Sequence, residues 1–302
     1  MPEMKKSKLS VYSFLPLLAA IVWGFGFVAQ VSGIESVPPI FYNGVRFILA
    51  SIVLIPLFII LDRKTDKTTI INTIKYGSIA GIFLCIAASI QQFGLVLTSS
   101  AAKGGFFTSL YAIFISIGEF LIFKKKISKY VWISVFVSIV GLFLICLGSD
   151  GDITNFTVTA GDLVLLLCAV AFAAHIIFID KVIEKVSPVL FSIVQFFTVG
   201  IISLIYSLIF EDPTLSAIKS AGIPILYGGV VSCGIGYTLQ IFSQKSRTPI
   251  LTGIMFSTES AFALIGGALI LNERLNAVSI LGCVLVLFSV ILSQISGYLK
   301  KS

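Results

Sequence analysis

A single acid interrupts an apolar stretch of this 302-residue chain. Glu259 lies within IMFSTESAFALIGG, residues 254–267, and apolar residues continue on both sides from Leu251 to Leu271. If this stretch is a membrane helix, Glu259 is about 16 Å from its start, close to the midplane. A charge there costs at least about 2.5–3.5 kcal/mol. The carboxyl is therefore expected to face the protein interior or a water-filled cavity, or to be protonated. It fits a counter-charge for a substrate ammonium, a proton-coupling group, or a neutral hydrogen bond to a neighbouring helix.

Three aromatic residues are candidates for the same space. Tyr111 offers a hydroxyl and an aromatic face that suit a cation, or packs as an ordinary helix residue. Trp23 lies in mid-span and not at the interface where tryptophans gather, which favours cavity lining or simple packing. Tyr237, one turn before Gln240, is predicted to line the same route as that amide.

Four further polar residues lie inside apolar runs. His175, the only histidine, either carries protons or is packed and hydrogen-bonded. Gln92 and Gln240 are candidates for gates at opposite mouths, or for bonds between helices. Arg46 lies roughly 12 Å below one end of its span. It either snorkels, bonds carbonyls at a broken helix, or binds a substrate carboxylate.

The elements that position these residues follow from composition. The chain is 57% hydrophobic and 12% charged, against about 25% charged in soluble proteins, so it is predicted to be an integral membrane protein. Its runs are continuous and not alternating, which excludes a β-barrel. No basic face with interleaved aromatics predicts a nucleic acid partner. Ten helical spans are expected, at 11–31, 39–61, 76–97, 102–123, 130–148, 161–179, 188–209, 222–243, 249–271 and 278–297.

Lysine and arginine predict the orientation. With the N-terminus in the cytoplasm, 17 of the 21 basic residues fall on the inner side and Arg46 lies within a span. Only Lys103, Lys219 and Arg274 fall outside. Both termini are therefore predicted to lie in the cytoplasm, in a multi-pass protein of the inner (cytoplasmic) membrane. The first span is expected to stay uncleaved, because its apolar run is long for a signal peptide.

The two halves resemble each other, over 11–148 and 161–297. At an offset of 148, Gln92 aligns with Gln240 and Tyr111 aligns with Glu259. Because each half has five spans, the second half enters the membrane from the opposite side. The predicted fold is an all-α polytopic membrane protein in which two inverted five-helix repeats surround a central cavity.

The chain resembles the EamA-type members of the drug/metabolite transporter superfamily. The likeness is carried by WGFGF from Trp23, by the Arg46-Phe47 pair, and by TESAFALIGGALILNERLN from Thr258. In the last stretch, Glu259 and Glu273 fill the family's two glutamate positions. Ser260 replaces the family's proline after the first glutamate, which puts the kink there in doubt. Lys125 aligns with Glu273, so that loop motif is not duplicated.

The resemblance implies a secondary transporter or facilitator of amino acids, related metabolites or amphiphilic drugs. It implies an exporter that works by alternating access without a cofactor. The expected partners are a small-molecule substrate and the lipid bilayer, with proton coupling as an open role, and the chain is expected to be a monomer or homodimer. No catalytic set or metal site is predicted from the residue types. An intramembrane lipid-modifying enzyme and a non-transporting scaffold or sensor remain as alternatives.

Overall fold

The computed structural model describes residues 14–61, 65–124, 127–149, 158–246 and 248–299, and this part of the chain is helical, without strands. Eight helical stretches are long and apolar enough to cross a membrane, and two shorter apolar stretches, Lys129–Ile145 and Ala277–Ser293, complete the ten predicted spans. The predicted fold class, ten spans in two inverted five-helix repeats around a central cavity, is confirmed.

The first half begins with one continuous span and one that is split. The first span is α1 (Leu15–Ile34), and the second consists of α2 (Pro39–Val53) and α3 (Ile55–Leu61). The third span is α4 (Lys67–Thr98), the fourth consists of α5 (Ala101–Ser109) and α6 (Tyr111–Leu121), and the fifth is α7 (Lys129–Ser149). The third span was expected to start near residue 76, but its helix α4 begins at Lys67, so this expected start is wrong for the helix. Asp66 caps α4 by accepting from the Thr69 N–H at 3.0 Å, and the first turns are polar. Hydropathy locates the part of a helix that lies in hydrocarbon, not the helix end.

The second half follows the same plan with an extra surface helix. The sixth span is α8 (Ala160–Val182), which the short turn η2 (Ile183–Lys185) joins to the seventh, α9 (Pro188–Phe210). After the surface helix α10 (Leu215–Ser220), the eighth span consists of α11 (Gly222–Leu226), η3 (Tyr227–Tyr237) and α12 (Thr238–Ser246). The ninth span consists of α13 (Pro249–Phe256) and α14 (Glu259–Ile270), and the tenth is α15 (Ala277–Leu299). The segment η3 is a π-helix of 11 residues. Such i→i+5 winding is rare and frequently marks a functional site.

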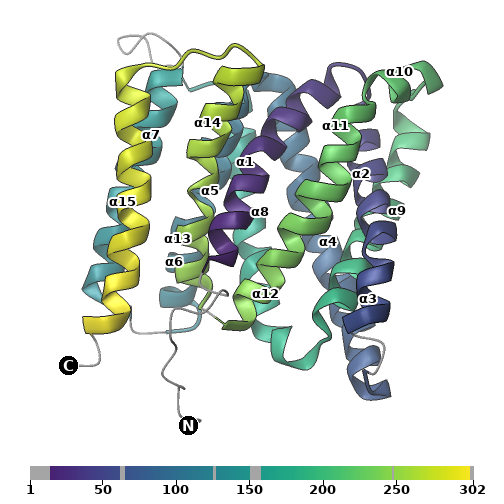
Figure 1. Ribbon diagram of the computed structural model, residues 1–302, viewed down its shortest axis with the longest axis horizontal. Helices are drawn as coiled ribbons and strands as arrows, with labels where there is room; N and C mark the ends of the chain where they lie inside the picture. Colours follow the sequence, from purple (N-terminus) through teal and green to yellow (C-terminus); the bar gives the residue numbers. More distant parts are fainter. Residues whose placement is uncertain (1–13, 62–64, 125–126, 150–157, 247, 300–302) are drawn as a thin grey trace.

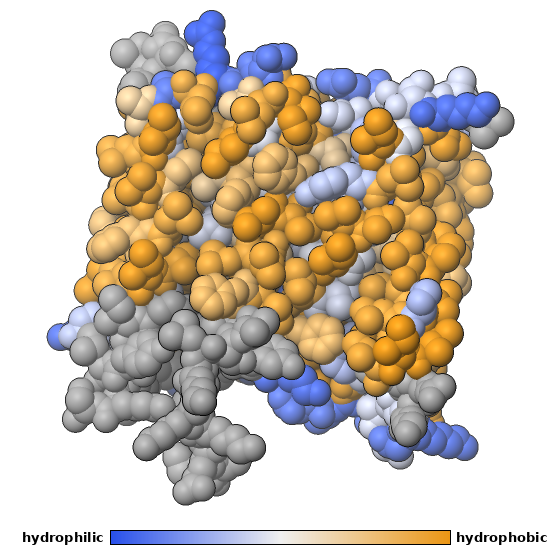
Figure 2. Space-filling model, in the orientation of Figure 1, coloured by the Kyte–Doolittle hydropathy of each residue, from blue (hydrophilic) through white to orange (hydrophobic). Residues whose placement is uncertain are grey.

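The spans stand roughly parallel, with α7 and α15 side by side at one end and α2 beside α9 at the other (Figure 1). An apolar belt covers the side of the molecule between two hydrophilic ends (Figure 2). Ile60, Leu208 and Leu269 expose 73%, 74% and 73% of their surface, which is expected for side chains that face lipid. We call the end where α2 and α5 begin the predicted outer face, and the opposite end the predicted cytoplasmic face.

Gly24 sets the distance between α1 and α14. A Cβ added at this position would lie 2.8 Å from the Glu259 carbonyl oxygen and 2.9 Å from the Ala263 nitrogen, both backbone atoms of α14. Small residues allow this close approach of membrane helices. One glycine of the WGFGF stretch therefore positions α1 against the helix that carries Glu259.

Gly24→Ala is expected to destabilise the protein by roughly 1–3 kcal/mol, the usual range for overpacking. The added methyl meets backbone atoms, which cannot move as a side-chain tip can. The measurement is the Tm of the purified protein in detergent, with Gly222→Ala as the matched control because nothing lies within 4 Å of a Cβ added there. Equal Tm values for the two variants would contradict the prediction.

The fourth and ninth spans are both interrupted at their centres, at equivalent positions of the repeat. At each interruption one turn tightens. The Leu110 N–H bonds to the Phe107 carbonyl at 3.2 Å, and the Thr258 N–H bonds to the Met255 carbonyl at 3.3 Å, both i→i−3. The helices resume at Tyr111 and at Glu259. Both residues are therefore the first of a half-helix near the midplane, the place where transporters of this architecture bind solute.

Hydroxyl groups account for the interruption in the ninth span, where the proline expected from related sequences is missing. The hydroxyls of Ser257, Thr258 and Ser260 donate to the carbonyls of Ile254, Met255 and Ser257 at 2.7–2.8 Å. Such back-bonding competes with the helix ladder and bends helices. The sequence left a kink here in doubt, because Ser260 replaces the family's proline. The interruption is nevertheless present, and the Ser260 hydroxyl contributes one of the bonds.

Two glutamates of the second half cap helices of the first half on the predicted outer face. Glu211, at the end of α9, accepts from the N–H groups of Ile40 and Phe41 at 3.0 and 2.7 Å. Glu273, after α14, accepts from the N–H groups of Ala101 and Ala102 at 2.6 and 3.1 Å. Each carboxyl fills two of the unpaired donors at a helix N-terminus. The two halves are therefore tied together at this face through α2 and α5.

On the predicted cytoplasmic face, the described residues provide no cap equivalent to that of Glu273. The helix equivalent to α5 is α13, which begins at Pro249 without a side-chain cap bond. In sequence, the residue equivalent to Glu273 is Lys125, which lies outside the described residues. A lysine ammonium has no acceptor and cannot take a bond from a helix N–H. The two faces of the repeat thus differ in how α5 and α13 are held.

Candidate functional site

A cavity lies at the centre of the molecule, between the two halves. Its empty volume is about 420 Å³, but the side chains leave room for only a few water molecules between them. An organic solute therefore needs the walls to move apart. The first, second, third, fourth, sixth, eighth and ninth spans contribute the walls, which are Trp23, Phe27, Gln30, Arg46, Gln91, Thr108, Tyr111, Phe172, Ile176, Ser232, Tyr237, Gln240 and Glu259.

Glu259 borders the cavity with 3% of its surface exposed. Its Oε1 accepts from the Ser109 hydroxyl at 3.3 Å, and Ser109 also donates to the Ser257 carbonyl at 3.3 Å. No lysine, arginine or histidine nitrogen of the described residues lies within 4 Å of the carboxyl. The Tyr111 hydroxyl lies close to the Glu259 carboxyl but outside regular hydrogen-bond geometry. A buried carboxyl with one weak donor is well placed to receive a cation.

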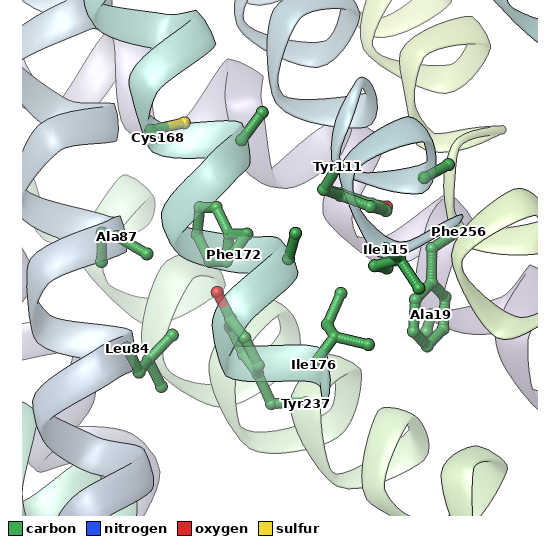
Figure 3. Packing of buried hydrophobic residues seen from close by; sticks show 14 of the residues in the cluster. Ala19, Leu84, Ala87, Tyr111, Ile115, Cys168, Phe172, Ile176, Tyr237 and Phe256 are labelled. Carbon is green, nitrogen blue, oxygen red and sulfur yellow. The ribbon is translucent and has the colours of Figure 1, made fainter. Parts of the chain in front are cut away.

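An aromatic wall stands beside Glu259. Trp23 packs between Tyr237 and Phe256, with ring centroids 4.9 and 5.0 Å apart, and its indole N–H donates to the Ser232 carbonyl at 3.1 Å. Figure 3 shows Tyr111, Phe172, Ile176 and Tyr237 around a common space. Aromatic faces attract cations. The wall therefore suits a solute that combines a cationic group with an apolar body.

Arg46 reaches the cavity from α2 and is 2% exposed. Its Nε and Nη2 both donate to Asn43 Oδ1, at 3.0 and 2.8 Å. The guanidinium lies over the rings of Tyr42 and Phe47, 5.5 and 4.8 Å from their centroids. The snorkelling reading of Arg46 is wrong, because the side chain is buried within the protein and does not reach an interface.

Two predicted residues lie away from the cavity lining. His175 on α8 is fully buried and its Nε2 shares a hydrogen bond of 3.1 Å with Gln195 Oε1 on α9. Gln92 is also fully buried, with neither amide atom hydrogen-bonded. Its neighbour Gln91 borders the cavity instead and donates to the Thr108 hydroxyl at 3.2 Å. Trp23, Tyr111, Tyr237, Gln240, Arg46 and Glu259 are all in the lining.

Other lining residues were missed in the sequence, although helical spacing carried a signal for some of them. Phe27 and Gln30 lie four and seven residues after Trp23, on one face of α1. Thr108 lies three residues before Tyr111 on the interrupted fourth span. Phe172 and Ile176 are spaced like any apolar helix face. Nothing in the sequence distinguishes a cavity wall from packed core at those two positions.

Comparisons with known proteins agree with this architecture. A family model described as the EamA-like transporter family matches residues 10–147 and 159–294. The chain is 25% identical over 275 residues to an uncharacterized transporter of Archaeoglobus fulgidus, covering 91% of this chain and 83% of that protein. It is 26% identical over 176 residues to a Salmonella typhimurium protein named "Probable amino-acid metabolite efflux pump", covering 57% of this chain and 54% of that one. A protein crystal structure with 14% identity has the same fold, with a TM-score of 0.76 over 96% of this chain and 99% of that chain.

Proposed function

Because the chain belongs to the EamA-like transporter family, and is thus a multi-pass membrane transporter of small solutes, we propose that its solutes carry an ammonium group and cross by alternating access through the central cavity. The Glu259 carboxyl is the counter-charge in this proposal. The rings of Trp23 and Tyr237, which line the cavity, hold the apolar part of the solute, and Phe256 packs against Trp23.

One observation carries the proposal: a buried carboxyl borders the cavity without a cation among the described residues. An ionised carboxylate is costly to bury unless it is paired. An arriving ammonium removes that cost, and so does a proton. Glu259 can therefore exchange one for the other, which gives proton coupling and solute binding at a single group. The alternative of a lipid-modifying enzyme has no support here, because the relatives are named transporters.

Export is the proposed direction, which agrees with the name of the Salmonella relative. Alternating access is supported by two features of the cavity. Its walls come from both halves of the repeat, and they are too close together to admit an organic solute without moving. The half-helices that begin at Tyr111 and Glu259 provide the points at which such movement can occur.

Reconstitution of the full-length protein into liposomes tests the proposal. Labelled L-leucine, L-phenylalanine, L-leucinamide and L-phenylalaninamide are expected to show saturable counterflow above protein-free liposomes, because all four carry the ammonium group. The matched acid 3-phenylpropionate, which lacks it, is expected to show none. Failure of every amine to move, or equal movement of the acid, would refute the proposal.

The orientation is a separate proposal, based on the excess of basic residues on one side. A topology reporter fused after Lys126 or after Lys301 is expected to indicate the cytoplasm, and one inserted between Ser149 and Ala160 is expected to indicate the outside. The measurement is paired alkaline phosphatase and fluorescent-protein activity in cells. A reporter after Lys126 that is active outside would contradict the orientation.

A further inference from the structure

Arg46 presents an unmatched positive charge to the central cavity. Its guanidinium has five N–H donors, and two of its nitrogens share one acceptor, Asn43 Oδ1. The described residues place no carboxylate within 4 Å of it and offer Nη1 no acceptor. Burial of a charge without a partner is among the most costly arrangements in a protein. Packing on the rings of Tyr42 and Phe47 offsets part of the cost but uses none of the remaining N–H donors.

A second unpartnered donor lies beside it. The Asn43 side chain is fully buried, and its Nδ2 has no hydrogen-bond partner although its Oδ1 has two. Asn43 thus holds the guanidinium in place and leaves its own amide hydrogens unused. Arg46 lines the cavity whereas Asn43 does not, so the N–H donors available there are those of the guanidinium that Asn43 positions.

We infer that Arg46, positioned by Asn43, forms an anion subsite for a carboxylate of the transported solute. The inference rests on the proposed function and narrows it. A planar guanidinium matches the two oxygens of a carboxylate. Glu259 borders the same cavity, and Tyr237 lies within electrostatic reach of both charges. A solute that satisfies both ends carries an ammonium and a carboxylate, and the aromatic wall between them favours an apolar side chain.

The structure gives a reason for the fixed position of Arg46. Gly228 of the π-helix η3 lies against its stem, and a Cβ added there would be 3.3 Å from Arg46 Cδ. The Tyr42 hydroxyl donates to the Pro224 carbonyl at 2.9 Å, which fixes the ring on which the guanidinium lies. The arginine is therefore held by its stem and its ring contacts, with its charge left for a ligand.

Equilibrium binding to the purified full-length protein tests the subsite with matched probes. L-leucine is compared with L-leucinamide, and L-phenylalanine with L-phenylalaninamide, because each amide keeps the ammonium and side chain but lacks the carboxylate. The wild-type protein is expected to prefer each acid by roughly ten- to 150-fold, the equivalent of one charged hydrogen bond. Arg46→Gln is expected to bring the two affinities together by weakening the acid alone. Lys219→Gln, which removes an exposed charge on α10, is the matched control and is expected to keep the preference.

Two further arms keep the test decisive. Arg46→Lys keeps the positive charge but loses the planar pair of N–H donors of the guanidinium. It is therefore expected to retain part of the preference for the acid over the amide, even if Arg46→Gln does not fold. Replacing chloride by gluconate separates a solute carboxylate from an inorganic anion. An acid preference that appears only without chloride would show competition for the subsite and support it. Equal affinities of acid and amide in wild type, in both buffers, would overturn the subsite while the proposed function stands. Binding of neither acid nor amide would overturn the proposed function itself.

Discussion

Glu259→Gln is expected to weaken binding of amine-bearing solutes by roughly ten- to 150-fold, the range for one charged hydrogen bond. The amide keeps the size of the side chain and can still accept from the Ser109 hydroxyl, so the variant is expected to fold. The loss should appear in the dissociation constants of L-phenylalanine and L-phenylalaninamide alike, because both present the same ammonium. This pattern differs from that expected for Arg46→Gln, which affects the acid only.

Transport by the same variant separates the roles of the carboxyl. If Glu259 also couples transport to protons, Glu259→Gln retains solute exchange in liposomes but no longer responds to a pH gradient. The matched control is Glu119→Gln, since Glu119 is also buried but lies outside the cavity lining and pairs with Lys181 at 3.7 Å. Wild-type affinity and flux in Glu259→Gln, with only Tm changed, would leave Glu259 a structural residue.

Glu273→Ala is expected to open the predicted outer face. The substitution leaves the N–H groups of Ala101 and Ala102 without their acceptor when the two halves are closed, whereas water reaches them when the halves separate. Loss of even one bond to a charged group, about 1.5–3 kcal/mol, shifts a closed-to-open ratio by roughly ten-fold or more. Spin labels at the exposed positions Ser99 and Arg274, in a cysteine-free background, should report a longer distance. Glu35→Ala, an exposed acid on the same face, is the control, and an unchanged distance in Glu273→Ala would contradict the prediction.

The same residue predicts a pH dependence. Burial raises the pKa of the Glu273 carboxyl, although the N–H groups of Ala101 and Ala102 act in the opposite direction. Once the face opens, the carboxyl is exposed and its pKa returns to an ordinary value. The closed state therefore binds the proton more tightly, so acid favours closure. Opening is therefore favoured as the pH rises from the ordinary pKa of the exposed carboxyl in the open state to the raised pKa of the buried carboxyl in the closed state. Glu273→Gln does not titrate, so it is expected to lose this response to pH.

The fold was predictable because membrane burial leaves a strong record in sequence. Ten apolar runs and a nearly constant offset between the halves predicted the repeat. The interruptions were not predicted, because the kink at Glu259 was in doubt without the family's proline and none was expected at Tyr111. The caps by Glu211 and Glu273 were not predictable. Each joins groups about 170 residues apart in the chain, and neither leaves a local pattern such as a capping box. The role of Glu273 in particular depends on which helix end lies next to it in space.

Register explains the different outcomes for Gln92 and Gln240. The repeat aligns these two amides, yet only Gln240 borders the cavity. Gln92 lies on α4, which is a regular α-helix, whereas Gln240 follows the π-helix η3. A π-helix has more residues per turn, so side chains after it point in a different direction from their aligned partners. Adjacent residues on an α-helix differ by about 100°, and for this reason Gln91 reaches the cavity while Gln92 does not.

The cap of α5 by Glu273, which has no counterpart on α13 among the described residues, has a consequence for kinetics. A contact present in only one conformation sets how often an empty carrier presents its site to each compartment. The apparent affinity measured from one side is the intrinsic affinity multiplied by the fraction of molecules open to that side. Solute should therefore half-saturate the carrier at different concentrations from the two sides, with the higher concentration required on the side that the cap closes. The direction of net flow does not follow from this bias, because at equal electrochemical potential the two unidirectional fluxes must cancel.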